Sequence, residues 1–310
     1  MPDAMNASRG SFGRTLKLYL VDGSPTGVIT AELGNWSGKV VVASRSALPG
    51  LIKREETEQT GVYLLTGPDP KNPNRTLVYV GESDTVKNRL VAHDKDDDKQ
   101  FFTRICVIVS KDENLTKAHG RYLESRILTL IKEAARARLV NNTKPEFHGL
   151  PEPEIADMEG FLVEIEVLLP VLGFDLLRGG TGLEFGDGNG AEKDPIFEFS
   201  QAGAYARARE AGGEFVVLNG STARVKENKT CPDGIRDLRN QLVEDLALVK
   251  EAGGELYRFV RDVPFGSPSG AAATVYGGTA NGHKLWRVEG SDLSYGEWRE
   301  RLLATAQGTY

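Results

Sequence analysis

Two short apolar segments, each with one tyrosine, constrain the fold of this 310-residue chain more than any other feature. The first, Gly61–Thr66, has the sequence GVYLLT and contains Tyr63; the second, Thr76–Gly81, has the sequence TLVYVG and contains Tyr79. Aromatic and β-branched residues favour strands, and the intervening PDPKNPNR is rich in the Pro and Asn residues of turns. The pattern therefore predicts a β-hairpin with a long loop between its strands.

A short amphipathic helix is predicted directly after the hairpin. Ser83 and Asp84 are both residue types that cap helix N-termini. The apolar positions that follow recur at helical spacing: Val86, Leu90 and Val91. Arg89 lies in this helix, and His93 follows one turn later.

A third strand and a long helix are predicted next. The strand is FFTRICVIVS, in which Cys106 points into the core, and the helix runs from Thr116 to about Arg138. Glu124 lies at the edge of the apolar stripe of that helix, beside Leu123. A glutamate in such a position is by default a surface residue, so the pattern alone leaves open whether it is solvated or faces a cleft beside the hairpin.

Six features in this order resemble the GIY-YIG nuclease family. They are GVY with Tyr63, YVG with Tyr79, Arg89 ten residues later, His93, Glu124 in YLES, and Asn141 in LVNNTKP. The resemblance implies an α+β fold over residues 61–150, with a small three-stranded antiparallel sheet flanked by helices. The chain departs from the family in two details: fifteen residues separate the tyrosines, and YVG replaces YIG.

The activity implied by the resemblance is that of a hydrolase, a metal-dependent endonuclease that cuts phosphodiester bonds in nucleic acid, with DNA expected rather than RNA. Glu124 would hold a single Mg²⁺ (or Mn²⁺), which needs few protein ligands because it keeps most of its waters. Tyr63 would be the general base or would orient the attacking water. Since an ordinary tyrosine pKa is near 10, this role requires nearby cations to lower the pKa of Tyr63.

The other family residues have implied roles as well. Arg89 would lower that pKa and bridge phosphate oxygens, Tyr79 would bind the water or a phosphate oxygen, and His93 would act in proton transfer or phosphate contact. Asn141 would position the glutamate or the active-site backbone, although the adjacent Asn142 leaves open which asparagine does so. Taken singly, each residue also fits an ordinary role, such as a strand aromatic, an exposed helix face or a helix C-cap.

The charge distribution leaves a second function open. The net charge is −6, yet residues 61–150 carry 15 basic and 12 acidic side chains, whereas the remainder carries 23 and 32. The segment with the nuclease-like pattern is thus the basic one, as phosphate attraction requires. Because the excess is small, binding to nucleic acid is expected to be weak and salt-dependent. The alternative function is a non-catalytic module that binds nucleic acid or a protein partner.

The segments before the hairpin predict a short β segment that forms a small antiparallel sheet. After a loose tail over 1–13, three strands are expected within 14–60, with Trp36 in a turn that covers one end of a little core. Residues 46–58 predict a short helix whose string LIKREETEQT is a solvated, charged face. The charge run HDKDDDKQ after His93 predicts a solvated loop.

Three further segments are predicted after the nuclease-like module. A helical extension covers 151–180, with Pro170 ending or kinking it, and a Gly-rich linker covers 181–195. Residues 196–310 predict a separate α+β domain, which resembles the C-terminal domain of unknown function that often follows GIY-YIG modules in bacteria. The resemblance depends on FVVLNGSTARV and SPSGAAATVYGGTANG. Five basic residues there suggest a modest basic patch, although a solvated face is the stronger interpretation: Arg224, Lys226, Lys229, Arg236 and Arg239.

The cysteines and the apolar segments bear on the compartment. Cys106 and Cys231 lack a nearby His or Cys partner, which argues against a zinc site or a disulfide framework. No apolar run approaches the twenty or so residues of a membrane span, and the N-terminus lacks the apolar core of a secretory signal. The expected compartment is the cytoplasm.

Overall fold

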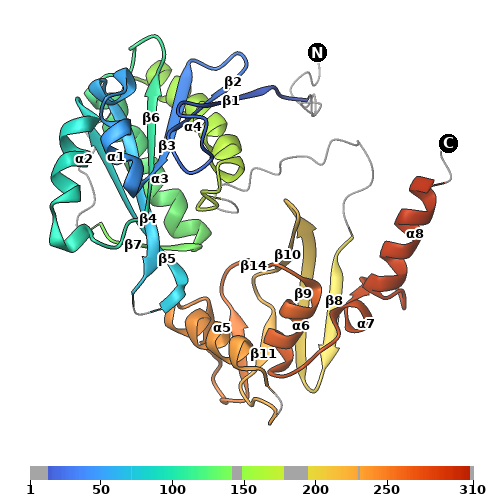
Figure 1. The fold of residues 1–310 in the computed structure, drawn as a ribbon. Coiled ribbons are helices and arrows are strands. Elements are labelled where there is room, and N and C mark those ends of the chain that lie inside the picture. The colour runs from blue at the N-terminus through green and yellow to red at the C-terminus, as the bar shows by residue number, and fades with distance from the viewer. Residues whose placement is uncertain (1–12, 71, 142–148, 178–194, 230, 308–310) are drawn as a thin grey trace. The chain divides into compact units, whose positions relative to one another are not determined.

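The computed structural model describes residues 13–70, 72–141, 149–177, 195–229 and 231–307. It divides the chain into two compact units, Phe12–Leu183 and a second unit that contains Glu184–Tyr310 (Figure 1). The fold is mixed α+β, as expected. Apart from Gly13 and Pro195, the predicted tail and linker lie outside the described residues. Within the described residues, no helix combines the length and apolarity needed to cross a membrane.

A seven-stranded sheet forms the centre of the first unit, in the order β1-β2-β3-β6-β4-β5-β7. Its strands are β1 (Leu16–Leu20), β2 (Ile29–Leu33), β3 (Gly38–Ser44), β4 (Gly61–Asp69), β5 (Asn72–Ser83), β6 (Arg104–Ser110) and β7 (Ala137–Leu139). All neighbouring strands are antiparallel except β5 and β7, which are parallel.

The N-terminal strands belong to the same sheet as the strands of residues 61–150, so the observed sheet is larger than the small N-terminal sheet and the three-stranded sheet that were expected. β3 pairs with β6 along its whole length, from Gly38 opposite Ser110 to Ser44 opposite Arg104. Successive residues of β3 are buried on both faces of the sheet, from Val40 to Ala43. A strand whose residues are apolar on both faces must be packed against other elements on both faces, as an interior strand of a sheet is.

The hairpin is longer and tighter than predicted. β4 and β5 pair continuously from Gly61 opposite Ser83 to Pro68 opposite Thr76, and a register shift follows at Asp69. The expected long loop is therefore wrong, because most of PDPKNPNR belongs to the strands. β4 pairs with β6 only as far as Thr66, so Pro68 lies where β4 has no partner on its other side, a position that a strand proline tolerates.

Helices cover both faces of the sheet (Figure 1). α1 (Leu48–Leu51) and α2 (Val86–Asp94) pack on one face, in the core that contains Tyr63. α3 (Lys117–Ala134) and α4 (Glu152–Val171) pack on the other face, in the core that contains Val62, Val80 and Cys106. Alternate residues of β4 and β5 thus face α2 and α3. The predicted turn position of Trp36 over a core is confirmed, since its ring lies 4.9 Å from that of Phe161 in α4.

One long helix ends earlier than predicted, and the other ends beside the proline that was predicted to end or kink it. Thr116 caps α3, as expected, by accepting a hydrogen bond from the backbone N–H of His119. The helix ends at Ala134, Ala135 adopts a left-handed conformation, and Arg138 lies in β7 instead of the helix. α4 ends at Val171, within a turn of Pro170, which agrees with a proline near a helix end.

The charged segment over 46–58 differs from its prediction. Instead of one helix it forms α1 between two 3₁₀ turns, Arg45–Ala47 and Glu55–Glu58. Glu56 is 1% exposed, and its Oε1 accepts from Arg54 at 2.8 Å and from Lys39 of β3 at 2.7 Å. The expected solvated face is therefore wrong at Glu56, because the neighbouring strand supplies a cation to pair with it.

The second unit contains two sheets, of order β14-β10-β9-β8-β15 and β11-β13-β12. The strands are β8 (Phe197–Gln201), β9 (Ala204–Ala211), β10 (Glu214–Val217), β11 (Thr222–Arg224), β12 (Leu248–Lys250), β13 (Leu256–Phe259), β14 (Val263–Phe265) and β15 (Arg287–Val288). The helices are α5 (Asp233–Glu244), α6 (Pro268–Tyr276), α7 (Gly282–Leu285) and α8 (Tyr295–Gln307). The alanines of α6 are buried, which confirms the predicted close packing of this small-residue helix.

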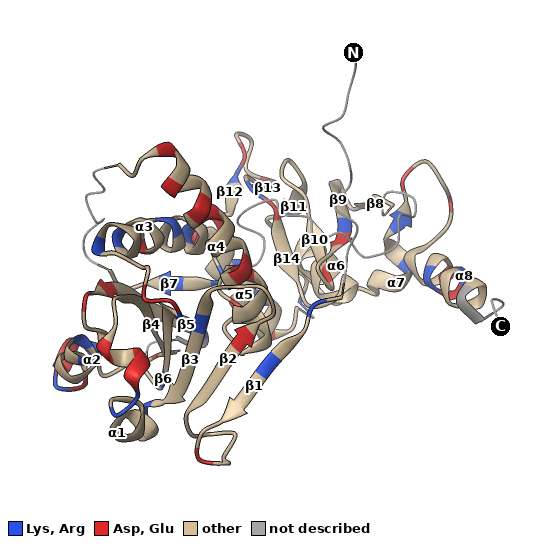
Figure 2. Ribbon diagram, turned by 90° about the horizontal axis from the view of Figure 1, so that it is seen from above, with Lys and Arg blue, Asp and Glu red and all other residues tan. Residues whose placement is uncertain are grey.

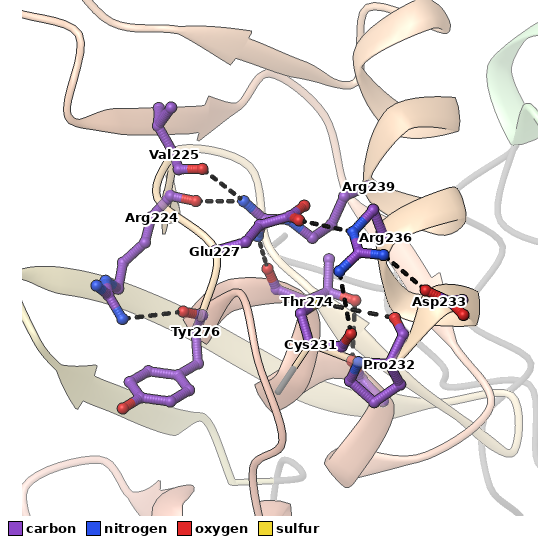
Figure 3. A network of polar contacts seen from close by, with 11 residues as sticks. Arg224, Val225, Glu227, Cys231, Pro232, Asp233, Arg236, Arg239, Thr274 and Tyr276 are labelled. Atoms are coloured by element: carbon purple, nitrogen blue, oxygen red, sulfur yellow. Dashed lines mark hydrogen bonds and ion pairs between the residues drawn. The ribbon is translucent and has the colours of Figure 1, made fainter. Parts of the chain in front are cut away.

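Arg239 of α5 joins three elements of the second unit, as Figure 3 shows. Arg239 is 2% exposed, and its guanidinium donates to the backbone carbonyls of Thr274 in α6 and Arg224 in β11, and to Glu227 Oε1 at 3.2 Å. Arg236 donates to Glu227 Oε2 at 3.1 Å and to Asp233 at 2.6 Å. The expectation of a solvated basic face is therefore wrong for Arg239, which is buried. Both Arg236 and Arg239 are paired with carboxylates.

Candidate functional site

Tyr63 lies at the centre of the candidate site, on the face of the sheet that α2 covers. Its side chain is buried, and its hydroxyl is 2.8 Å from Nε2 of His93 in α2. Gly81 lies directly opposite Tyr63 in the hairpin, and a Cβ added there would be 2.5 Å from the phenol oxygen. The glycine of YVG therefore makes room for the tyrosine of GVY.

Tyr79 is half-buried next to the same histidine. The centroids of the Tyr79 and His93 rings are 5.0 Å apart in an edge-to-face arrangement, and those of Tyr63 and Tyr79 are 6.2 Å apart. The ammonium of Lys99 lies 4.5 Å from the centroid of the Tyr79 ring, a cation–π contact. The predicted hairpin and helix thus bring the two tyrosines and His93 together.

Arg89 extends from α2 toward solvent one turn before His93. α2 begins after Thr85, whose N–H donates to the Ser83 hydroxyl, so the expected cap at Ser83 or Asp84 is displaced by one or two residues. Among the described residues, Arg89 has no hydrogen-bond or ion-pair partner. Its positive charge nevertheless lowers the pKa values of Tyr63, His93 and Glu124 in part, so it lies close to all three.

Glu124 lies on α3 with its side chain half-buried. Burial and the negative charge of Glu82 raise the pKa of its carboxyl to about 7, against the opposing positive charges of Arg121 and Arg89. Its charge also acts on both tyrosines. Glu124 therefore belongs to the same electrostatic neighbourhood as the hairpin tyrosines, although its helix packs on the opposite face of the sheet.

Asn141 binds the backbone of β5 immediately after β7. Its Oδ1 accepts from the N–H of Val80 at 3.0 Å, and its Nδ2 donates to the carbonyl of Val80 at 2.7 Å. The side chain thus continues the pairing of β7 with β5 and holds the residue between Tyr79 and Gly81. Of the two roles left open for Asn141, the geometry favours holding the site backbone. Asn142 lies outside the described residues.

The pKa values of the tyrosines and the histidine shift in opposite directions. Burial raises the pKa of Tyr63 well above its usual range and raises that of Tyr79, and in both cases it outweighs the opposing charge of Arg89. Burial, together with the positive charge of Lys99, lowers the pKa of His93. Arg89 opposes the effect of burial on Tyr63 only in part, so the expectation that nearby cations lower the pKa of Tyr63 is wrong for the protein without bound metal or nucleic acid. At neutral pH, Tyr63 is a protonated phenol and His93 a neutral imidazole.

Two charged residues at the site were missed by the sequence analysis. Lys99 belongs to the run HDKDDDKQ, which was expected to be a solvated loop, yet its side chain is buried against Tyr79. Glu82 follows YVG directly and faces α3. One signal for Glu82 was present in the sequence, because the period of two in a strand places it on the face opposite Tyr79 and Gly81. No local signal distinguishes Lys99 from its charged neighbours.

The charge around the site is mixed, as Figure 2 shows for α2 and α3. α4 is different, with six acidic residues and no lysine or arginine among its twenty residues. A cavity of about 530 Å³ between Trp36, His119 and α4 is also lined by acidic side chains and contains none of the predicted site residues. Among the described residues, no group of three or more His, Cys, Asp or Glu side chains is arranged to hold a metal ion.

Comparisons with known proteins concern the second unit. Residues 197–299 match the model of a family described as a domain of unknown function, DUF4357. This match supports the expected C-terminal domain of unknown function, and no match to the GIY-YIG family accompanies it. No curated protein and no solved structure matches the chain.

Proposed function

We propose that the first unit is a metal-dependent endonuclease of the GIY-YIG type, which hydrolyses phosphodiester bonds in nucleic acid, with DNA as the preferred substrate. The observation that supports this proposal is the grouping of Tyr63, Tyr79, Arg89, His93 and Glu124 around one end of the β4–β5 hairpin. These five side chains come from four elements, and contacts and mutual charge effects link them.

Glu124 is the residue that would hold the divalent cation, Mg²⁺ or Mn²⁺. The residues present fit such an ion, because the carboxylate of Glu124 has no hydrogen-bond or ion-pair partner among the described residues. The nearby Glu82 has a buried Oε2 that also lacks a hydrogen-bond partner. When bound, the cation would stabilise the negative charge that develops on the phosphate.

Tyr63 and His93 provide a route for the proton of the attacking water. As the water oxygen attacks phosphorus, its proton passes to the Tyr63 oxygen while the Tyr63 proton passes to Nε2 of His93, which becomes imidazolium. The bond from phosphorus to the leaving oxygen breaks, and that oxygen takes a proton from solvent. A neutral His93, favoured by its lowered pKa, is the form that accepts the proton.

The remaining residues bind and position. Arg89, exposed and without a protein partner among the described residues, can contact two phosphate oxygens through its planar guanidinium. Tyr79, fixed by His93 and Lys99, presents its hydroxyl next to that of Tyr63. Asn141 keeps the backbone between Tyr79 and Gly81 in place.

The alternative function is a module that retains this fold and binds nucleic acid or a protein partner without cutting. The observation that favours it is the negative charge, which is −6 for the whole chain and concentrated on α4 in the first unit. A phosphate backbone is repelled by such a surface, so the basic groups near the hairpin would have to supply the attraction.

A cleavage assay with Mg²⁺ tests the proposal on single- and double-stranded DNA and RNA. We expect cleavage of DNA that stops when EDTA removes the metal. The substitutions Glu124→Gln and Arg89→Ala are each expected to lower the rate of DNA cleavage by about 10²–10³-fold. This is the usual effect of removing one group that stabilises transition-state charge.

Glu133→Gln is the matched control, because Glu133 is an exposed glutamate of the same helix and is not part of the site. It is expected to cut like the unchanged protein. Equal cutting by the Glu124 and Arg89 variants would reveal a contaminating nuclease. Binding of nucleic acid without any cleavage would support the non-catalytic module instead.

A further inference from the structure

We propose that Glu82 is a second anionic residue of the cation site, which raises the affinity of the Glu124 carboxylate for a divalent cation. This inference depends on the proposed function, since it concerns the same cation. It assigns a role to a residue outside the six that suggested the nuclease.

The strand register places Glu82 on the face of the sheet that α3 covers. Glu82 is paired with Val62, whose side chain lies in the core shared with α3 and α4. A Cβ added at Gly120 of α3 would lie 3.5 Å from the Cβ of Glu82 and 3.8 Å from its Oε2. Glu82 therefore lies against the first turn of α3.

Glu124 follows Gly120 by four residues in α3, so both lie on the same face of the helix. Residues spaced by four on a helix have Cβ positions about 5–6 Å apart. Helical side chains also lean toward the N-terminus, so the side chain of Glu124 extends over the turn that contains Gly120. Because Gly120 has no side chain, none from this position separates the two carboxylates.

The charge of Glu82 is only weakly compensated by the protein. Its Oε1 lies 3.5 Å from Nε of Arg121, a long ion pair with a side chain that is 47% exposed. Its Oε2 is buried and has no hydrogen-bond partner among the described residues. A buried carboxylate oxygen without a partner is unfavourable, and a divalent cation between two glutamates would stabilise both.

A purely structural role for Glu82 makes a different prediction from a role in cation binding. If Glu82 serves only to pair with Arg121, then neutralising either residue breaks the same ion pair, and both substitutions should change the cation affinity in the same direction. If Glu82 attracts the cation, Arg121 competes with that cation for the carboxylates. Glu82→Gln and Arg121→Gln should then change cation affinity in opposite directions.

Binding of Mn²⁺ to the full-length protein, measured by the electron paramagnetic resonance signal of the free ion, is the test. We expect Glu82→Gln to weaken binding by roughly tenfold, Arg121→Gln to strengthen it several-fold, and Glu124→Gln to abolish it. Glu82→Asp, which keeps the charge, should stay within a few-fold of the unchanged protein. Asp84→Asn is the matched control, because it neutralises an exposed carboxylate two residues away that pairs with Lys117, and no change is expected.

Each outcome bears on one of the two proposals. Unchanged Mn²⁺ affinity in Glu82→Gln, with binding still lost in Glu124→Gln, overturns the role of Glu82 and leaves the nuclease proposal standing. Weaker binding in both Glu82→Gln and Arg121→Gln supports the structural ion pair and also overturns the inference. No Mn²⁺ binding by the unchanged protein overturns the cation site itself. If Glu82→Gln fails to fold, Glu82→Met, which fills similar space without burying a polar group, takes its place in the same comparison.

Discussion

At the scale of single residues, the site depends on a glycine that leaves space for a tyrosine. Tyr63 is 1% exposed, and its phenol lies directly over Gly81. A Cβ at Gly81 would come within 2.5 Å of the hydroxyl that contacts His93. The two motifs GVY and YVG are thus parts of one packing arrangement, in which the smallest residue of the second accommodates the largest residue of the first.

Gly81→Ala is therefore expected to displace the Tyr63 ring and break its hydrogen bond to His93. Overpacking of this kind costs about 1–3 kcal/mol of unfolding free energy, measured by urea denaturation. The NMR signal of the His93 ring should change at the same time. Unchanged stability and an unchanged His93 signal would contradict the steric conflict between a methyl group at position 81 and the Tyr63 ring.

Gly160→Ala is the control for that substitution. Gly160 lies in α4 with no atom within 4 Å of an added Cβ, so the methyl group has open space. Since alanine favours helix over glycine, this change is expected to stabilise the protein by up to about 1 kcal/mol. The opposite signs of the two glycine substitutions separate steric conflict from the general effect of adding a methyl group.

At the scale of elements, ion pairs connect the 3₁₀ turn Glu55–Glu58, which precedes the hairpin, to strand β3 of the sheet. Glu56 lies in the 3₁₀ turn that precedes β4, and its carboxylate is held by Arg54 and by Lys39 of β3. Burial alone would raise the pKa of Glu56, but the hydrogen bonds from Arg54 and Lys39 outweigh it and lower the pKa to about 2. These contacts align the start of β4 with the neighbouring strands.

Because the pKa of Glu56 is lower in the folded than in the unfolded chain, its ionised form stabilises the fold above the unfolded value, near 4.5. This stabilisation, roughly 3 kcal/mol, is lost as the pH falls from about 4.5 toward 2. Glu56→Gln should therefore be less stable than the unchanged protein at pH 7, and the difference should shrink below pH 4.5. Urea denaturation between pH 3 and 7 measures it. A difference that is independent of pH would show that the ion pairs contribute little.

At the scale of the whole molecule, the two units have separate cores. Among the residues that the structure describes, none is shared between the clusters around the seven-stranded sheet and the aromatic cluster of the second unit. Trp286 is central to that aromatic cluster: it is fully buried, its Nε1 donates to the carbonyl of Pro268 at 2.9 Å, and its ring lies 5.0 Å from that of Phe215. Separate cores allow the units to unfold in separate steps.

Trp286→Ala is expected to destabilise the second unit by about 3–5 kcal/mol, the usual cost of truncating a buried aromatic residue. Hydrogen exchange followed by mass spectrometry measures each unit separately. Peptides of β8–β10 and α6 should exchange faster, whereas peptides of β4–β6 and α3 should be unchanged. Equal acceleration in both sets would show that the two units unfold as one.

Local patterns were sufficient to predict the hairpin strands, α2, the start of α3 and the close-packed α6, because each depends on residues near one another in the chain. The predicted site residues Tyr63, Tyr79 and His93 also meet, since one hairpin and the following helix contain all three. The extent of the sheet could not be predicted in this way. It depends on pairing β3 with β6, whose paired residues are sixty or more positions apart.

Strand and helix periods and turn residues act over a few positions, so the amino-acid sequence alone was enough to locate most strands and helices and to identify the residue types available to the site. The protonation states of these residues and their contact partners depend on the assembled fold. Burial, a property of the folded molecule, raises the pKa values of Tyr63 and Glu124 and lowers that of His93. Packing of α3 against β5 brings Glu82 close to Gly120 and Glu124, because side chains far apart in the chain meet only when the sheet and its helices are assembled.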